Sequence, residues 1–365
     1  MSACEMSQGS PGNLPHRLRR LVATVRLHAV AWLCHYLCIS LLFFRLNRGR
    51  KRIITYHNVL PDAQFRGALH EGVSHSAGVF RQQLSYLRRT FPCDTDLDNP
   101  YSLAITFDDG YLNQYTEAHP ALVESGLRAY FFCTLALWEA AEPLAIDRLL
   151  CWLSYVPHGV YAFPLLVRNA PLALSIASDV DRHYCWETLS RLLTAGEIGE
   201  EKLITMLEAH VPFASVRASL SAEAYARRFT SIPEGAIAEM QAWGHRFGAH
   251  GRTHKIMALL DDETLEKEVA ACSAQFGARL NSSVFSYPYG GRREVTPRVV
   301  ACVKAHGFTR AVSNVNDPPD GEMQYSAMFM PRFALPNTAT PYILSFVLSG
   351  AKYFLQHRRL LPVCS

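Results

Sequence analysis

Beyond residue 51 the chain alternates between strand-like and helix-like segments, and this alternation limits the possible folds more than any other feature. Apolar, β-branched segments are typical of buried strands and occupy 52–57, 102–107, 128–135, 245–250, 283–290, 308–314 and 332–336. Amphipathic segments lie between several of them, at 80–91, 113–126, 261–277 and 296–307. Strands that alternate with helices form a largely parallel sheet, so the sequence predicts an α/β fold.

One long stretch, residues 138–232, interrupts this alternation between the third and fourth predicted strands. It begins with an apolar, aromatic segment and continues with mostly helical, mixed-charge sequence. A connection of this length is unusual inside a compact domain, so we expect a helical insertion that forms a cap or lid. The predicted organisation is therefore an N-terminal segment 1–51, a main domain 52–341 that contains the insertion, and an amphipathic tail 342–365.

The N-terminal segment combines an apolar run with most of the positive charge. Residues 27–44 are apolar except for His28, His35 and Ser40. As a helix they would reach about 27 Å, just short of a hydrocarbon core of about 30 Å. Residues 1–52 hold nine Lys or Arg and one acid. We expect this segment to associate with a membrane surface, the alternative being a hydrophobic helix packed on the domain.

The charge distribution and the cysteines indicate the cellular location of the protein and exclude one class of partner. The body of the chain after residue 52 carries 27 bases and 31 acids, which excludes a nucleic-acid-binding surface of the usual kind. The basic cluster 45–52 favours the cytoplasmic face of a membrane, with a soluble cytoplasmic protein as the alternative. Ten cysteines without a C-x-x-C pair indicate free thiols more than a disulfide framework. Residues 342–361 are again apolar and then basic, and would lie on the same membrane surface or pack as a helix.

Three groups of polar residues follow predicted strands. They are the adjacent carboxylates Asp108 and Asp109, the pair His250 and His254, and the sequence FSYPYGG at 285–291. Active sites of α/β sheets lie at the carboxyl ends of the strands, so these groups should come together. Two imidazoles and one carboxylate suit a divalent metal such as Zn²⁺. Neighbouring side chains on a strand point in opposite directions. One aspartate can therefore face the metal while the other lies beside a water molecule bound to that metal.

These motifs also resemble a known family. The sequences ITFDDGY, GAHGRTH and FSYPYGG are similar to the first three motifs of the polysaccharide deacetylases, carbohydrate esterase family four, which includes chitin and chitooligosaccharide deacetylases. The segments at 54–59, 80–87 and 260–269 match the family layout as well, so the resemblance covers roughly 52–137 and 230–336. It implies a distorted (β/α)₇ barrel and metal-dependent hydrolysis of N-acetyl groups on amino sugars.

The resemblance also implies roles for single residues. Asp109, His250 and His254 match the metal ligands, with zinc expected first and cobalt, nickel or manganese as alternatives. Asp108 matches the catalytic base. The resemblance further assigns the oxyanion and substrate contacts to the loop that holds Pro288, the Tyr289 backbone N–H and Gly290.

Several positions depart from the family pattern. Gly251 replaces the usual Ser or Thr after the first histidine, and no arginine precedes Pro288. The closing Leu-x-Ile-His motif that normally supplies the general acid is absent near the C-terminus, where Arg332 stands instead and is expected to contact substrate. His57 is our candidate for the acid, with a structural histidine as the alternative, and His306 is a weaker candidate.

The sequence thus predicts a metal-dependent hydrolase whose partner is an acetylated amino-sugar glycan, either a polymer, an oligomer or a lipid-linked glycan. Two alternatives stay open. The same activated water would attack esters, which gives a carbohydrate O-acetyl esterase. A protein of this fold without activity would be a carbohydrate-binding protein. The identity of the glycan and the oligomeric state do not follow from the sequence.

Overall fold

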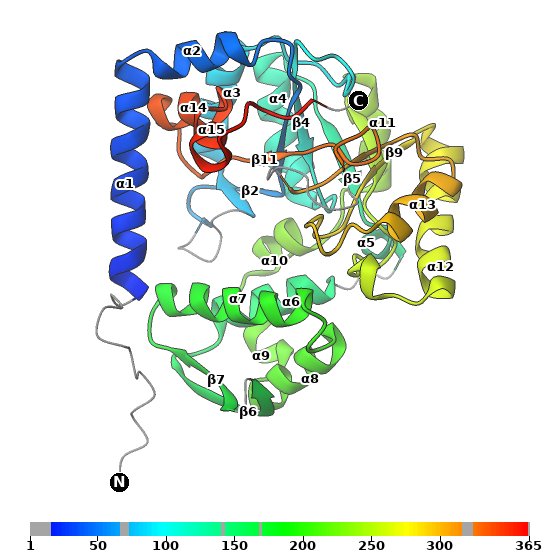
Figure 1. Ribbon diagram of the computed structural model, residues 1–365. Coiled ribbons are helices and arrows are strands. Elements are labelled where there is room, and N and C mark those ends of the chain that lie inside the picture. The colour runs from blue at the N-terminus through cyan, green and yellow to red at the C-terminus, as the bar shows by residue number, and fades with distance from the viewer. Residues whose placement is uncertain (1–15, 66–72, 140–142, 168–169, 316–323, 364–365) are drawn as a thin grey trace.

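The computed structural model describes residues 16–65, 73–139, 143–167, 170–315 and 324–363 (Figure 1). Its centre is a seven-stranded sheet in the order β10-β9-β8-β5-β4-β1-β11, and every neighbouring pair of strands is parallel. The strands are β1 (Arg52–Tyr56), β4 (Leu103–Phe107), β5 (Tyr130–Cys133), β8 (Arg246–Ala249), β9 (Val284–Ser286), β10 (Arg310–Val312) and β11 (Phe333–Ala334). β1 and β4 are buried along their whole length, as expected for parallel strands covered on both faces.

The two edges of this sheet are joined by one short segment. Met330 forms a parallel bridge with Val312 of β10, and its N–H donates to the Ala311 carbonyl at 2.9 Å. Three residues later Phe333 pairs with Ile54 of β1. The segment therefore contacts both edge strands, and the sheet curls into a distorted seven-stranded barrel. The predicted α/β barrel is confirmed.

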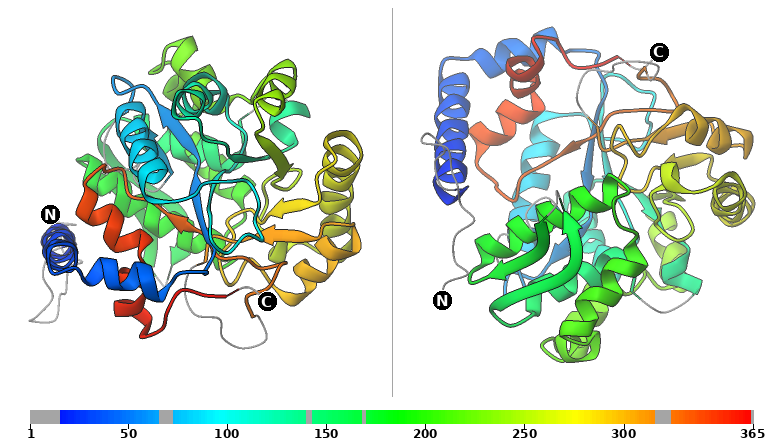
Figure 2. Two further views of the ribbon diagram at one scale, coloured as in Figure 1. Left: turned by 90° about the horizontal axis from the view of Figure 1, so that it is seen from above. Right: turned by 60° about the horizontal axis from the view of Figure 1, so that its bottom comes forward.

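Helices cover the outside of the barrel, and all of them except α11 follow the predicted segments (Figures 1 and 2). They are α3 (Ala77–Thr90), α4 (His119–Ser125), α11 (Glu234–Ala242), α12 (Asp262–Cys272) and α13 (Pro297–Ala305), with short turns η2 (Gln114–Ala118), η3 (Met257–Leu259) and η4 (Ser273–Arg279). The side chains of Ser76, Asp261 and Thr296 cap α3, α12 and α13 by accepting a backbone N–H. A small parallel pair, β2 (Asn58–Leu60) and β3 (Ser74–Ser76), lies beside the carboxyl end of β1.

The insertion folds as a cap with its own apolar core, which includes Trp152, Leu153 and Leu189. Its helices are α6 (Ala145–Tyr155), α7 (Asp179–Thr194), α8 (Glu200–His210), α9 (Phe213–Arg217) and α10 (Ala222–Phe229), and the short α5 (Ala136–Glu139) precedes it. The expected insertion was helical. An antiparallel hairpin, β6 (Gly159–Val167) and β7 (Ala170–Ile176), forms instead in a stretch rich in aromatic and branched residues.

The two chain ends pack together on one side of the barrel. The apolar run near the N-terminus is divided between α1 (His16–Tyr36) and α2 (Ile39–Leu46), because Cys38 adopts φ 59° between them. The C-terminal segment forms α14 (Pro341–Leu348) and α15 (Ala351–His357). Residues 343–348 of α14 are all buried, so this part of the predicted tail takes the second of the two expected forms, a helix packed on the fold. The eight cysteines that the structure describes are unpaired.

Candidate active site

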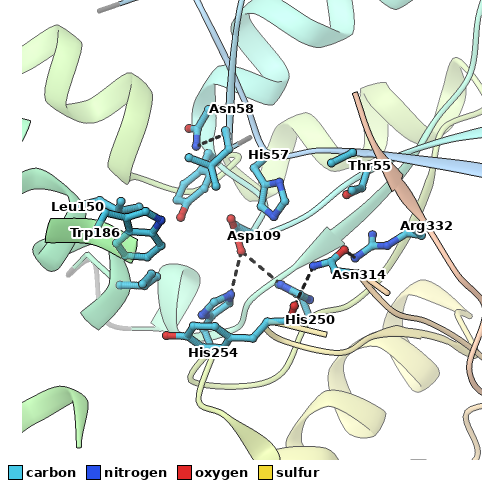
Figure 3. Close-up of a pocket in the computed structure, with 15 residues that line it drawn as sticks. Thr55, His57, Asn58, Asp109, Leu150, Trp186, His250, His254, Asn314 and Arg332 are labelled. Atoms are coloured by element: carbon cyan, nitrogen blue, oxygen red, sulfur yellow. Dashed lines mark hydrogen bonds and ion pairs between the residues drawn. The ribbon is translucent and has the colours of Figure 1, made fainter. Parts of the chain in front are cut away.

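A cavity of about 280 Å³ lies at the carboxyl ends of the barrel strands, between the barrel and the cap (Figure 3). The barrel contributes His57, Asp109, His250, His254, Tyr289, Asn314 and Arg332 to its wall, and the cap contributes Ile146, Leu150 and Trp186. Residues far apart in the sequence therefore meet in one place. All three groups of polar residues singled out in the sequence contribute to this site.

The candidate metal ligands converge on one carboxylate oxygen. Asp109 Oδ1 lies 3.4 Å from His250 Nε2 and 3.2 Å from His254 Nε2 (Figure 3). All three side chains are buried, and Asp109 Oδ1 has no hydrogen-bond partner. Although burial opposes ionisation, the neighbouring imidazoles of His250 and His254 hold the pKa of Asp109 well below its ordinary value. A buried, ionised oxygen without a hydrogen-bond partner is the kind of group that a cation would stabilise.

The orientation of His250 supports the same interpretation. Its Nδ1 lies 2.8 Å from the Ser286 carbonyl, which can only accept, so Nδ1 carries the proton. When the ring is uncharged, this tautomer directs the Nε2 lone pair toward Asp109 and His254. A backbone partner that fixes the tautomer in this way is typical of histidines that bind metals. The two nitrogens and one carboxylate oxygen fit a divalent ion such as zinc and leave further positions open.

Several residues of the site have an unfavourable backbone conformation. Asp109, His254 and Tyr289 have φ values of 74°, 59° and 60°, in the left-handed region that side chains disfavour. Gly110 follows Asp109 with φ 83°, and a Cβ there would lie 2.7 Å from the Cys133 sulfur. Strained residues of this kind concentrate at functional sites, and here they place a carboxylate, an imidazole and a backbone amide around one cavity.

Asp108 points to different partners from Asp109. It accepts hydrogen bonds from Arg332 at both oxygens, at 2.7 Å and 2.5 Å, and from the Ser286 hydroxyl at 3.1 Å. Its side chain is completely buried. Burial disfavours its charge, yet Arg332 and then His250 hold the pKa of Asp108 below its ordinary value. Asp108 therefore stays ionised behind the cavity wall.

Arg332 does not have the position that was expected for a substrate contact. Its guanidinium donates to Asp108, Thr106, Ser286, Asn314 and the Ser313 carbonyl. These bonds engage all of its nitrogens, and its side chain has no exposed surface, although it forms part of the cavity wall. The prediction is corrected, because Arg332 holds Asp108 in place and has no free donor for substrate. It also brings an arginine to the third motif, which lacks one in sequence.

His57 lies where strand β1 ends and lines the cavity (Figure 3). Its Nε2 is 3.8 Å from Asp108 Oδ2, and 18% of its side chain is exposed. Burial lowers the pKa of His57, although Asp109 and Asp108 oppose this effect. The Gln114 amide donates to the His57 carbonyl at 2.9 Å and fixes the loop. His57 is thus a neutral imidazole that faces the cavity and has a carboxylate behind it.

The loop of Pro288, Tyr289 and Gly290 closes another side of the cavity. A Cβ at Gly290 would lie 2.7 Å from the Asn314 nitrogen, so only glycine allows the two segments to approach this closely. Asn314 Nδ2 donates to the Tyr289 carbonyl at 3.1 Å. Within the described residues, no acceptor binds the Tyr289 backbone N–H. The Tyr289 ring lies against His254, with ring centroids 5.2 Å apart.

Two residues that support the site were not found from the sequence. Glu268 on α12 accepts the backbone N–H groups of Arg252 and Thr253 at 3.0 and 2.9 Å, so it holds the loop between the two histidines. Glu200 at the start of α8 accepts the Tyr289 hydroxyl at 2.5 Å and links the cap to the oxyanion loop. A buried acid on an amphipathic helix was the only available signal for Glu268. Nothing in the sequence connected Glu200 with Tyr289.

His306 lies away from this cavity. Its Nε2 contacts Glu266 Oε1 at 3.0 Å, and its neighbour Cys302 lies on the same helical turn. These three residues form a separate cluster between α12 and α13. His306 is therefore too far removed to serve as the general acid, and the prediction that placed it as a weak candidate is corrected.

The comparisons with known proteins agree with this geometry. Residues 206–311 match the family described as polysaccharide deacetylase. This part of the chain is similar to that family. The match includes His250, His254 and the Tyr289 loop, whereas Asp108 and Asp109 precede it. The family resemblance seen in the motifs is confirmed, and with it the prediction of an enzyme of the deacetylase class.

The chain is also similar to solved structures. The first is the deacetylase PplD from Streptococcus pyogenes in complex with acetate, at 13% identity over 81% of this chain and 96% of that chain, with a TM-score of 0.47. IcaB from Ammonifex degensii is 16% identical over 81% and 96%, with a TM-score of 0.44. A de-N-acetylase from Aggregatibacter actinomycetemcomitans is 12% identical over 80% and 96%, with a TM-score of 0.43. No curated protein matches the chain.

Proposed function

We propose that this protein hydrolyses N-acetyl groups on the amino sugars of a glycan, with a divalent metal held by Asp109, His250 and His254. The observation that carries the proposal is the buried, unpartnered Asp109 Oδ1 that lies within 3.4 Å of both imidazole nitrogens. When bound, the ion would supply a Lewis acid that lowers the pKa of water, with zinc as the first candidate. The remaining chemistry belongs to the side chains around it.

Asp108 and His57 form the proton-transfer pair in this proposal. Asp108 accepts the proton of the attacking water, and His57 donates a proton to the leaving amine. Arg332 keeps Asp108 charged and fixes both of its oxygens. One observation favours a second arrangement, because Asp108 is completely buried whereas His57 lines the cavity. In that arrangement His57 takes the proton itself and Asp108, 3.8 Å behind it, stabilises the imidazolium.

The Tyr289 backbone N–H is proposed as the oxyanion donor. It belongs to a residue held at φ 60° by the loop, and its carbonyl is fixed by Asn314. A donor that is already oriented needs no rearrangement as charge develops on the acetyl oxygen, which is the source of its catalytic effect. Pro288 and Gly290 act through the shape of this loop.

The cap favours a short or terminal part of the glycan over the middle of a long chain. Ile146, Leu150 and Trp186 close the cavity opposite the histidines, and the volume is about 280 Å³. A lined cavity of this size accommodates a sugar ring and its acetyl group more readily than an extended polymer. An oligomer end or a lipid-linked glycan fits this description.

Acetate release from N-acetylglucosamine oligomers of increasing length tests the proposal. We expect release that is lost after chelation, returns with zinc, and does not increase with chain length beyond a few sugars. Faster release from O-acetylated than from N-acetylated sugars would support the esterase alternative. Glycan binding without any acetate release from the metal-loaded protein would support the catalytically inactive alternative.

The pH dependence separates the two proton arrangements. If Asp108 is the base, His57→Gln keeps the acidic limb of the kcat/KM profile and loses the basic limb. If His57 takes the proton, the acidic limb shifts or disappears in the same variant. The Asp108→Asn variant should be nearly inactive in both cases, so its kcat/KM gives the lower limit with which the other variants are compared.

A further inference from the structure

The outer face of α1 and α2 is the largest concentration of exposed apolar side chains in the described part of the chain. Nine of the sixteen large hydrophobic side chains that are exposed there lie between Val22 and Leu46. They include Trp32, Leu33 and Tyr36 on α1, and Leu41 and Leu42 on α2. α1 forms the edge of the molecule and α2 continues from it around a corner (Figure 1). A monomeric soluble protein rarely leaves such a contiguous surface uncovered.

The inner face of the same helices is already used by the fold. Ala31, Cys34 and Phe43 are buried with Ile343 and Phe346 of α14 in one apolar cluster. Seen from above, α1 stands end-on at the periphery with the C-terminal helices beside it (Figure 2). The pair of helices is therefore firmly attached to the barrel on one side only. The apolar side chains on the outer face are therefore left without a surface that covers them.

The polar residues that interrupt the apolar run also point toward the fold. His28 Nδ1 lies 3.0 Å from the Tyr342 hydroxyl, and His35 Nδ1 lies 2.9 Å from the Ser345 hydroxyl. Ser40 is buried. These interruptions weakened the apolar pattern in the sequence, yet they do not interrupt the outer face. That face presents aromatic and aliphatic side chains, with Trp32 and Tyr36 among them, as interfacial helices do.

The bend between the two helices favours an arrangement in which they lie on a bilayer over one in which they cross it. No single described helix is long and apolar enough to cross a membrane, and Val22–Tyr36 with Ile39–Leu46 passes only as a pair bent by 76°. A straight crossing would require the bend to open and both histidine contacts with α14 to break. Lying in the interface requires neither change, because the apolar face is already exposed.

Positive charge surrounds the apolar face and identifies the kind of surface. Arg26, Arg45 and Arg48 are exposed on or beside these helices, and residues 16–52 include no acidic residue. Basic side chains close to an anionic bilayer strengthen binding to it. A second copy of the chain is a poor occupant, since a symmetric contact would bring two such basic segments together.

We infer that the outer face of α1 and α2 docks on an anionic membrane surface, with both helices lying in the interface and the barrel held outside the bilayer. The cytoplasmic leaflet is a surface of this kind, which agrees with the side expected from the basic cluster 45–52. Docking would place the enzyme where lipid-linked glycans occur, a substrate class that rests on the proposed function. The docking itself does not depend on activity.

Vesicle sedimentation of the full chain tests this inference. The probes are vesicles of phosphatidylcholine alone and of phosphatidylcholine mixed with phosphatidylglycerol. We expect binding to the mixed vesicles that weakens with salt, and about a tenfold lower partition coefficient for Leu33→Glu combined with Leu42→Glu. Val160→Glu is the matched control, because Val160 is 71% exposed on the cap and lies outside the face. Arg45→Gln with Arg48→Gln should lower binding to the mixed vesicles only.

Several results would overturn the inference. These are unchanged binding by the Leu33→Glu, Leu42→Glu variant, equal binding to both kinds of vesicle, or no binding by the wild-type chain. A dimer that this variant dissociates, without vesicle binding, would show that the face joins two copies instead. Circular dichroism verifies that each variant is folded. Since sedimentation needs no turnover, failure of the proposed deacetylation leaves this test valid.

Discussion

Arg332 and Asp108 form a bidentate ion pair with no exposed surface, although 223 intervening residues separate them in the chain. The pair joins the last strand of the barrel to the end of β4. A buried charge that loses its partner is strongly destabilising, whereas removal of both charges leaves a neutral, packed site. The pair therefore contributes to the fold as well as to the chemistry proposed for Asp108.

The first prediction concerns this pair. Arg332→Gln and Asp108→Asn should each lower the free energy of unfolding by about 3–5 kcal/mol, because each leaves one buried charge. The double variant should lose less than the sum of the two. Urea unfolding followed by circular dichroism measures all three. Additive losses would show that the two side chains stabilise the fold independently.

The second prediction concerns the metal site. His254→Ala and Asp109→Asn should each reduce zinc bound per chain to a small fraction of the wild-type value, because one of three protein ligands is lost. Calorimetric titration of the metal-free protein with zinc gives the affinity without any activity assay. His210→Ala is the control, since His210 lies at the end of α8 and belongs to neither group of candidate ligands. Unchanged zinc affinity in both ligand variants would contradict the assignment.

The third prediction concerns Glu268, which touches no candidate ligand. Glu268→Gln should weaken zinc binding about 10- to 100-fold, because the loop that presents His250 and His254 loses a charged acceptor for two backbone N–H groups. Glu263→Gln on the same helix is the matched control, because Glu263 is exposed and belongs to neither group of candidate ligands. Equal affinities in the two variants would mean that the loop is held by other contacts.

The fourth prediction concerns the cap. Trp186→Ala should raise KM for N-acetylglucosamine oligomers about fivefold with a smaller effect on kcat, because an aromatic wall of the cavity is lost far from the reacting groups. Tyr184→Ala on the same helix is the control, since Tyr184 is 55% exposed and does not line the cavity. A change confined to kcat would indicate that Trp186 acts on the chemical step.

The fifth prediction concerns stability against pH at the opposite end of the barrel. His245 is buried as a neutral ring, since its Nδ1 accepts the Ala129 N–H at 3.1 Å and its Nε2 lies 3.0 Å from His119 Nδ1. Burial, with help from His119 and Arg128, lowers the pKa of His245 to about 3. Because the folded-state pKa lies below the unfolded value of about 6.5, this contribution is present above that pH and is lost as the pH falls.

Between pH 7.5 and 5, His245 should therefore cost the native state about 2 kcal/mol of unfolding free energy. Urea unfolding at both pH values, compared with His245→Asn, measures this difference. The variant is expected to be less stable at pH 7.5 but to lose less on acidification. An identical loss in both proteins would show that other groups cause the acid sensitivity.

Much of the fold was predictable because strand and helix periodicity are local properties. The segments at 52–57 and 102–107 became β1 and β4, and the segments that end at Gly126 and Gly307 became α4 and α13. The segment 261–277 became α12 and η4, which continues past Gly277 to Arg279. The meeting of Asp109, His250 and His254 was predictable as well, because the carboxyl ends of parallel strands share one edge. The hairpin β6–β7 inside the cap was not predicted. Its two strands form one long apolar segment, and a segment of that length is also compatible with a buried helix.

The sequence by itself determined the alternating elements and the three motifs, because periodicity, glycine positions and residue chemistry are written locally. Only the tertiary structure decided which distant residues contact these motifs. Closure of the barrel brought Arg332 beneath Asp108, α12 brought Glu268 to the histidine loop, and the cap brought Trp186 over the cavity. It also turned α14 inward and left the outer face of α1 and α2 exposed. Such contacts depend on how whole elements pack, and no local pattern records that packing.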